Sequence, residues 1–227
     1  MINFDNNIFK MGLNASPYKW KNFVVLCSSG VDSIAATHFI LKKIKQHNVA
    51  TLHFNHNLRL QNHEMATSYR HFCASLNMYP HVENIFCKGK TENHCRTERL
   101  KILNEYNNTI FISAHHLDDC VESYLLNVLR GKEGFIPIPF ITKLERSSSC
   151  IIHPFLFTKK SDFIEYAEKH DLMKHVVEDE TNKQIKGSRR NLMRNKIIPI
   201  LNEEKMGLQT IVKKKLKQRL MLELINI

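Results

Sequence analysis

The first half of the chain alternates between short apolar runs and longer segments with a helical pattern. The apolar runs are rich in Val, Ile and Phe, as buried strands are. They lie at residues 23–27, 49–54, 82–86 and 109–113. The segments that follow them have the length and period of helices, and they lie at residues 32–46, 61–76, 91–106 and 117–130. This order predicts an α/β fold with a doubly wound parallel sheet that is covered by helices on both faces.

The predicted sheet also indicates where a ligand would bind. In open parallel sheets, ligands bind beyond the carboxyl ends of the strands, at the point where the strand order reverses. We therefore expect the first strand, 23–27, and the fourth strand, 109–113, to border the site.

The regular pattern stops at Gly131. Residues 131–149 are interrupted by Gly, Pro and Ser, which favours a long excursion over the surface. A strand-like run follows at residues 150–157, and helical patterns lie at about 160–170, 188–201 and 207–222. The chain is accordingly divided into an N-terminal extension at residues 1–20, a main domain at residues 21–150 and a helical C-terminal part at residues 151–227.

Basic residues are concentrated near the C-terminus. The 227 residues carry a formal charge of +11. Twelve Lys and Arg and two Glu lie between Lys183 and Arg219, a local excess of ten positive charges. Such asymmetry indicates a polyanionic partner that docks there. The alternative is a pair of solvated amphipathic helices.

The six cysteines have no C-x-x-C spacing, so neither a zinc site nor a disulfide framework is expected. No apolar run approaches the roughly 20 residues of a membrane-spanning helix. The first residues lack the apolar core of a signal peptide. These features predict a cytoplasmic protein, or one of an organelle matrix or stroma, without a membrane partner.

A short polar loop follows the first predicted strand and opens a predicted helix. Small residues there let backbone N–H groups approach phosphate oxygens, and the helix N-terminus adds unsatisfied donors and a positive dipole end. The loop comprises Ser28, Ser29, Gly30, Val31, Asp32 and Ser33. It has no lysine and too few glycines for a Walker or dinucleotide motif. The alternative is an ordinary helix start with Asp32 or Ser33 as the N-cap.

A second polar cluster opens the helix after the fourth strand. His115 and His116 precede Asp118, Asp119 and Glu122, whose carboxylates share one helix face. Such a face could hold magnesium or the ammonium group of a substrate. The alternative is capping by an acidic first turn.

These motifs carry a resemblance to a known family. The loop resembles the SGGxDS loop of the PP-loop ATP pyrophosphatase superfamily, and the segment at 115–123 resembles the HHxDDxxET signature of tRNA(Ile)-lysidine synthetases. Asn57 stands for a glycine of that family, and it is a residue that tolerates left-handed turns. Ser29 also stands for a glycine, and a positive φ there would carry a steric cost. Similar motifs follow in family order at residues 54–59, 92–100, 178–182, 190–191 and 198–201.

The resemblance implies a two-step ligation. The wobble cytidine of a tRNA(Ile) with a CAU anticodon attacks the α-phosphate of ATP, pyrophosphate leaves, and L-lysine then displaces AMP to give lysidine. Residues 21–150 would be the PP-loop ATP-binding domain. Residues 151–227 would complete the catalytic unit with basic helices for tRNA.

The resemblance also implies roles for individual residues. ATP would be bound by Ser28, Ser29, Gly30, Val31, Asp32 and Ser33. Mg²⁺ would be bound by Asp32 and Asp118, and lysine by Asp119 and Glu122. Arg96 would stabilise phosphate charge, and His116 or Asp118 would accept a proton. The tRNA would be gripped by Arg99, Arg189, Arg190, Arg194 and Lys196, with the helix at 213–219.

Other functions stay open at this point. A tRNA thiolase of the same superfamily usually needs paired cysteines. A small-molecule amide ligase would leave the basic C-terminal part without a purpose. A degenerate tRNA-binding or nucleotide-binding protein would have lost catalysis. A homodimer could replace the C-terminal tRNA-binding region of longer family members.

Overall fold

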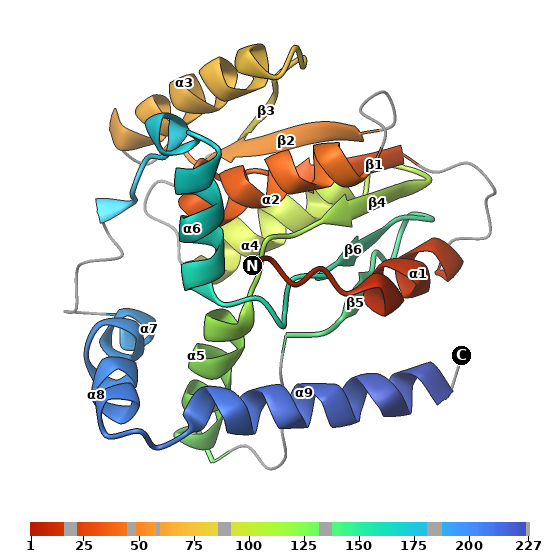
Figure 1. Cartoon of the computed structure of the whole chain (residues 1–227). Helices are drawn as coiled ribbons and strands as arrows, with labels where there is room; N and C mark the ends of the chain where they lie inside the picture. The colour runs from red at the N-terminus through yellow and green to blue at the C-terminus, as the bar shows by residue number, and fades with distance from the viewer. Residues whose placement is uncertain are drawn as a thin grey trace.

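A six-stranded sheet forms the centre of the described part of the chain (Figure 1). The computed structural model describes residues 1–15, 22–44, 49–57, 60–85, 92–131, 138–180 and 188–225. The strand order is β3-β2-β1-β4-β6-β5. The strands are β1 (Asn22–Leu26), β2 (Val49–Asn55), β3 (His81–Asn84), β4 (Thr109–Ile112), β5 (Ile141–Lys143) and β6 (Cys150–Ile152).

The strand order reverses between β1 and β4, as the sequence predicts. β1 pairs in parallel with β2 on one side and with β4 on the other, with Phe23 opposite both Val49 and Ile110. All four residues of β4 are buried, because a central parallel strand is covered on both faces. The loops after β1 and β4 therefore lie side by side at the carboxyl edge of the sheet.

The helices follow the predicted order. They are α1 (Asn6–Asn14), α2 (Val31–Lys43), α3 (Leu60–Ser75), α4 (Glu92–Leu103), α5 (Leu117–Val128), α6 (Lys160–Lys169), α7 (Arg189–Leu192), α8 (Ile198–Glu203) and α9 (Leu208–Ile225). A 3₁₀ turn lies at Met173–His175, and a π-helical turn at Met193–Ile197 joins α7 to α8. The long helix expected at 188–201 is thus interrupted by a wider turn.

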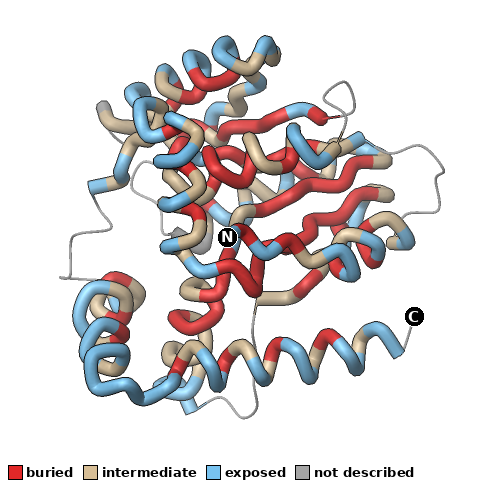
Figure 2. Tube along the Cα trace, viewed as in Figure 1, coloured by how far each residue is buried: buried red, intermediate tan, exposed pale blue. Residues whose placement is uncertain are grey.

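Helices cover both faces of the sheet (Figure 1, Figure 2). On one face, Leu103 of α4 packs with Val24 and Phe111 in a small core. On the other face, the larger core brings α1, α2, α3, α5, α6 and α9 together. Helix α9 contributes its buried residues at every fourth position, Leu208, Val212, Leu216 and Leu220. The C-terminal helix is therefore packed into the same core as the sheet.

The N-terminal residues also pack against the sheet. Asp5 caps α1 by accepting hydrogen bonds from the backbone N–H groups of Asn7 and Ile8. Gly12 lies so close to Ile152 of β6 that a Cβ atom would come within 2.6 Å of the isoleucine side chain. The described part of the predicted N-terminal extension is thus a helix that covers the β6 side of the sheet.

Two features differ from the sequence-based picture. Within the expected surface excursion at 131–149, Ile141–Lys143 forms β5, which pairs antiparallel with β6 at the sheet edge. Strand β6 itself starts at Cys150 and continues across the proposed division after that residue. The division stays a prediction, and the sheet is built from residues on both sides of it.

The cysteines of the described residues fall into two groups. Cys27, Cys73, Cys120 and Cys150 are buried free thiols. Cys95 is disulfide-bonded, which the sequence reading did not anticipate, and its partner lies outside the described residues. As for membranes, the described helices include none with the length and apolar content to span a bilayer.

Candidate active site

The loop between β1 and α2 presents the free N-terminus of a helix. Gly30 is the N-cap residue of α2, and no side chain caps it. The alternative reading, in which Asp32 or Ser33 is the N-cap, is therefore wrong. Ser33 instead braces the loop: its Oγ accepts from the Ser28 N–H at 3.0 Å and donates to the Gly30 carbonyl at 2.9 Å. Within the part of the chain that the structure describes, no side chain caps the α2 N–H groups, and uncapped N–H groups at a helix start are suited to binding phosphate.

Ser29 has the left-handed backbone conformation that its glycine-like position requires. Its φ is +69°, and Asn57, the other residue at a family glycine, has a φ of +48°. Ser29 is fully buried, and its Oγ donates to the Met65 carbonyl of α3 at 2.8 Å. Its own carbonyl accepts from the Val177 N–H at 3.0 Å. The serine is thus more strained in this conformation than a glycine would be, but it gains a hydrogen bond to α3.

The two contributions of Ser29 can be separated by mutation. Ser29→Ala loses the hydrogen bond and keeps the left-handed strain, so we expect it to lower the free energy of unfolding by about 1 kcal/mol. Ser29→Gly loses the bond but relieves the strain, so it should be more stable than the alanine variant by up to about 1 kcal/mol. Urea unfolding followed by circular dichroism measures both. An alanine variant at least as stable as the glycine variant would contradict the argument.

His116 joins the loop to the acidic cluster. Its Nε2 lies 3.4 Å from Asp32 Oδ2 and 3.5 Å from Asp119 Oδ2, and its Nδ1 lies 3.5 Å from Asp118 Oδ2. Burial alone would lower the pKa of His116, but the charge of Asp119 and the contacts with Asp118 and Asp32 raise that pKa to about 10. His116 is therefore a buried cation at neutral pH that holds three carboxylates together, which disfavours a role as proton acceptor.

The carboxylates of Asp32 and Asp118 differ in how many of their oxygens accept a hydrogen bond. Asp118 accepts from the Lys160 N–H and from Gln209 Nε2, each at 2.8 Å, so both of its oxygens are engaged. Asp32 Oδ1 is buried and has no hydrogen-bond partner among the described residues. Within the described residues, no group of three or more His, Cys, Asp or Glu could hold a metal by itself. The unpartnered Oδ1 of Asp32 suits a divalent cation such as magnesium, whereas each oxygen of Asp118 already accepts one hydrogen bond.

Asp119 and Glu122 are paired with arginines from the C-terminal part. Arg194 contacts Glu122 Oε1 through Nε and lies 3.4 Å from Asp119 Oδ1 through Nη2. Arg190 Nε lies 3.3 Å from Glu122 Oε2. The side chain of Glu122 is only 2% exposed, and burial raises its pKa despite the charge of Arg194. The carboxylates expected to bind lysine thus bind two residues expected to grip tRNA.

The capping interpretation of the acidic turn is also partly right. Asp119 Oδ2 accepts from the His116 backbone N–H at 3.0 Å, so it caps α5. Its Oδ1 faces Arg194, so one carboxylate serves the helix start and the site. Burial opposes ionisation of Asp119, but the charge of His116 and the hydrogen bond from the His116 backbone N–H outweigh it and hold the pKa of Asp119 below the usual range.

The other predicted residues surround this centre. Arg96, Arg189 and Lys196 are exposed, and Arg99 is half-buried. Burial, and next the charge of Arg99, lower the pKa of His56, which follows β2, to about 4. Arg59, Thr181 and Asn182, which belong to the family motifs, lie outside the described residues, as does the side chain of Glu92.

Sequence reasoning missed residues that complete the site. His153 follows β6, and its Nδ1 lies 3.2 Å from Nδ1 of His115, which also contacts Ser113 Oγ at 2.5 Å. Burial lowers the pKa of both histidines, so they are neutral. The position of His153 just after a strand next to β4 could have revealed it. The contact of Gln209 in α9 with Asp118 could not be predicted from a local sequence pattern, because the two residues are 91 positions apart.

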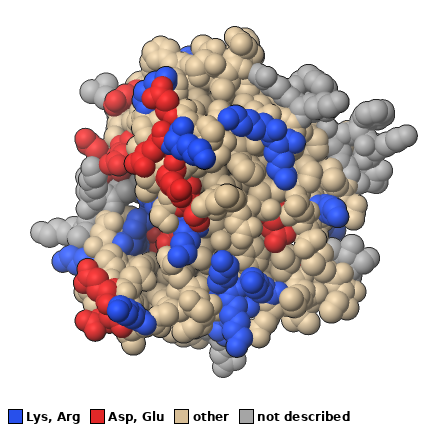
Figure 3. Space-filling model, viewed as in Figure 1, with Lys and Arg blue, Asp and Glu red and all other residues tan. Residues whose placement is uncertain are grey.

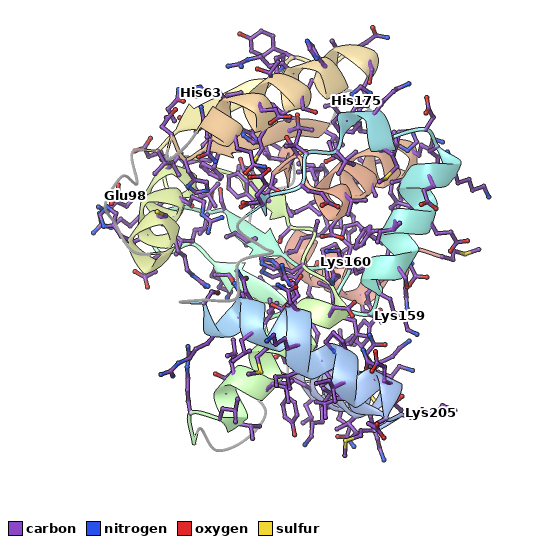
Figure 4. All side chains as sticks on the ribbon, turned by 90° about the vertical axis from the view of Figure 1, so that its left-hand side faces the viewer. His63, Glu98, Lys159, Lys160, His175 and Lys205 are labelled. Carbon is purple, nitrogen blue, oxygen red and sulfur yellow. The ribbon has the colours of Figure 1, made fainter. Side chains whose placement is uncertain are left out.

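The surface around the site is basic on the C-terminal side. Figure 4 shows Lys159 and Lys160 at the start of α6, on the side of the molecule that carries α7 and α8. Lysine and arginine side chains gather over the middle of α9 in Figure 3. Acidic groups inside the site and cations outside it suit a cationic substrate and a polyanionic one, respectively.

The fold and the uncapped loop define an α/β protein with a phosphate-binding loop at its topological switch point. Residues 4–201 match the family described as PP-loop domain, so the chain belongs to that family. Its relatives include tRNA(Ile)-lysidine synthases. That of Buchnera aphidicola subsp. Acyrthosiphon pisum is 32% identical over 197 residues, with 83% of this chain and 44% of that protein covered. That of Wigglesworthia glossinidia brevipalpis is 33% identical over 205 residues, with 81% and 49% covered.

Solved structures confirm the fold. The U34-tRNA thiolase NcsA from Methanococcus maripaludis, with its [4Fe-4S] cluster, has a TM-score of 0.65 at 15% identity, covering 95% of this chain and 78% of that one. NMN synthetase from Francisella tularensis has a TM-score of 0.54 at 14% identity, covering 92% and 91%. The chain spans about half the length of the Buchnera and Wigglesworthia lysidine synthases.

Proposed function

We propose that this chain is the catalytic unit of an ATP-dependent tRNA(Ile)-lysidine synthase, which attaches L-lysine to the wobble cytidine of a tRNA with a CAU anticodon. The observation that carries the proposal is the shared contact at His116. One nitrogen of that imidazole faces both Asp32 of the phosphate-binding loop and Asp119 of the acidic cluster. This contact supports a nucleotide site and a cation site that adjoin, as a reaction between ATP, RNA and lysine requires.

In the first step, the C2 oxygen of the cytidine attacks the α-phosphate of ATP and pyrophosphate leaves. Negative charge grows on the leaving group, and the uncapped N–H groups at the start of α2 would stabilise that charge. Magnesium, when bound with ATP, would neutralise phosphate charge beside Asp32. His116 is protonated there, so it holds Asp32 and Asp119 in place and adds positive charge next to the phosphates.

In the second step, an amine of lysine displaces AMP from C2 of the cytidine. Asp119 and Glu122 supply the negative charge that holds the lysine, and the lysine cation replaces the guanidinium of Arg194. The attacking amine must lose a proton. The pKa of Glu122 is raised by burial, so Glu122 is a better acceptor than Asp119, whose pKa is lowered.

The RNA-binding part of the proposal rests on the basic C-terminal surface. Lys213, Lys214, Lys215 and Lys217 lie on α9, whose apolar positions are turned into the core. Arg189 and Lys196 are exposed on the segment from α7 to α8. Cations gathered on two helical segments that follow one another in the chain suit the phosphates of an RNA strand.

The decisive experiment is attachment of radiolabelled lysine to a tRNA(Ile) transcript with a CAU anticodon, in the presence of ATP and magnesium. We expect incorporation that depends on ATP, together with tRNA-dependent exchange of pyrophosphate into ATP. A transcript with a CAU anticodon from a methionine tRNA is the matched control for substrate choice. Exchange without lysine incorporation would overturn the ligase assignment and favour another acceptor.

A tRNA thiolase is the nearest alternative, because a structurally similar protein has that activity. Thiolase chemistry needs reactive thiolates, which are favoured by a low pKa and access to solvent. Burial raises the pKa of Cys27 to about 11, and it raises the pKa of Cys73 and Cys120 as well. These described thiols are inert by that criterion, which supports ligation. A degenerate binding protein would bind tRNA or ATP without exchange.

A further inference from the structure

A cavity lies beside the acidic cluster, between the end of α5 and the segment from α7 to the π-helical turn. Its volume is about 250 Å³. It is lined by Leu126, Leu129, Arg130, Arg189, Leu192 and Met193. This is smaller than the roughly 300–1,000 Å³ of pockets for drug-sized ligands, so it suits one flat group at most.

The lining combines an apolar interior with two cations at the rim. Arg130 and Arg189 are exposed, and none of the described residues that line the cavity is a carboxylate. A cationic ligand such as lysine or a metal ion would be repelled. An apolar ligand without a charge would not pair with the two guanidinium groups. A ligand with a flat apolar surface and a neighbouring anion satisfies both parts of the lining.

The position of the cavity identifies the source of such a ligand. Leu126 follows Glu122 by four residues on α5, which is roughly 6 Å along the helix axis. On the other wall, Arg189 is adjacent to Arg190, which pairs with Glu122. Successive nucleotides of a stacked strand are about 3.4 Å apart and lie further apart when splayed. A strand whose reacting base is at the acidic cluster therefore passes the cavity one or two nucleotides away.

We infer that this cavity receives a second unstacked base of the substrate RNA, with Arg130 and Arg189 on its flanking phosphates. This inference rests on the proposed function, because it takes the acidic cluster as the place of the reacting cytidine. Leu129 and Leu192 pack against the faces of the base, and Met193 closes the interior. Binding two splayed bases sets the register of the anticodon loop on the protein and increases the affinity for the RNA.

The test uses an anticodon stem–loop RNA with a CAU anticodon and a set of copies that each lack one base of the loop. Binding is measured by fluorescence anisotropy for the wild type, Leu129→Ala and Arg130→Met. Both substituted residues are exposed, so the variants should fold normally. Arg146→Met, an exposed arginine on the turn between β5 and β6, is the matched control for loss of charge.

We expect one loop position, besides the reacting cytidine, where removal of the base weakens binding to the wild type on the order of tenfold. With Leu129→Ala, the same removal should have less than a threefold effect, since the base has lost its apolar contact. Arg130→Met should weaken binding of every RNA, and Arg146→Met of none. Variant and wild type responding alike at all positions would overturn the inference. A Leu129→Ala variant that changes self-association and not RNA binding would assign the cavity to a second copy.

The two proposals fail in distinguishable ways. If the wild type attaches lysine while base removal has the same effect in wild type and Leu129→Ala, the cavity has no base and the ligase function stands. If one position depends on Leu129 while no lysine is incorporated, the base-binding cavity stands and the reaction has been misassigned.

Discussion

Asp119→Asn should reduce incorporation of lysine into the CAU-anticodon tRNA by at least about 100-fold, because it removes the largely buried charge that we propose as a ligand of the substrate amine. The amide can still accept the hydrogen bond from the His116 N–H that caps α5. The variant should therefore bind ATP with nearly unchanged affinity. Radiolabelled lysine incorporation measures the first effect, and equilibrium dialysis with labelled ATP measures the second.

Asp162→Asn provides a control with the same local geometry. Asp162 accepts from the Lys159 backbone N–H at 3.0 Å at the start of α6, just as Asp119 does at the start of α5. It lies outside the acidic cluster. The control should keep nearly full incorporation. If both substitutions reduced incorporation equally, or if Asp119→Asn had little effect, Asp119 would be a helix cap and not a ligand of lysine.

The positions of the two loops could be predicted because local patterns determine them. The apolar runs of β1 and β4 mark central strands, and the reversal of strand order between such strands brings the loops after them together. The left-handed conformations at Ser29 and Asn57 were foreseeable for the same reason, since both stand at glycine positions of the family motifs. Short-range information was sufficient for these features.

The partners of the acidic cluster could not be predicted in this way. Glu122 and Arg194 are separated by 72 positions, and Arg194 lies within the π-helical turn at Met193–Ile197, a rare conformation that no local pattern in the sequence predicted. Gln209 and Lys160 reach Asp118 only through the packing of α9 and α6 around α5. Strand β5 has three residues, too few to show a period.

The pairing of Arg194 with the acidic cluster has a consequence for stability. Arg194→Met leaves Glu122, only 2% exposed, with Arg190 as its remaining guanidinium partner. Removing one member of a buried ion pair is costly, and Arg190 offsets part of the loss, so we expect the free energy of unfolding to fall by about 2 kcal/mol near neutral pH. Urea unfolding measures it. Lys101→Met, which breaks the exposed pair with Glu98, should cost less than about 0.5 kcal/mol.

The decrease in the free energy of unfolding caused by Arg194→Met should become smaller as the pH falls, because Glu122 becomes protonated. The pKa of Glu122 is raised in the folded protein, so the folded state takes up a proton at a higher pH than the unfolded chain does. The free energy of unfolding therefore increases as the pH falls through the pKa that Glu122 has in the folded state. Removing Arg194 raises that pKa further, so the variant gains more from protonation of Glu122 than the wild type does. The double variant Glu122→Gln, Arg194→Met should recover most of the loss and show little of this pH dependence. A decrease in stability that is equal at all pH values, or that is unchanged in the double variant, would mean that Arg194 stabilises the protein by packing and not by neutralising Glu122. The cation site proposed for lysine would then lose its main electrostatic support.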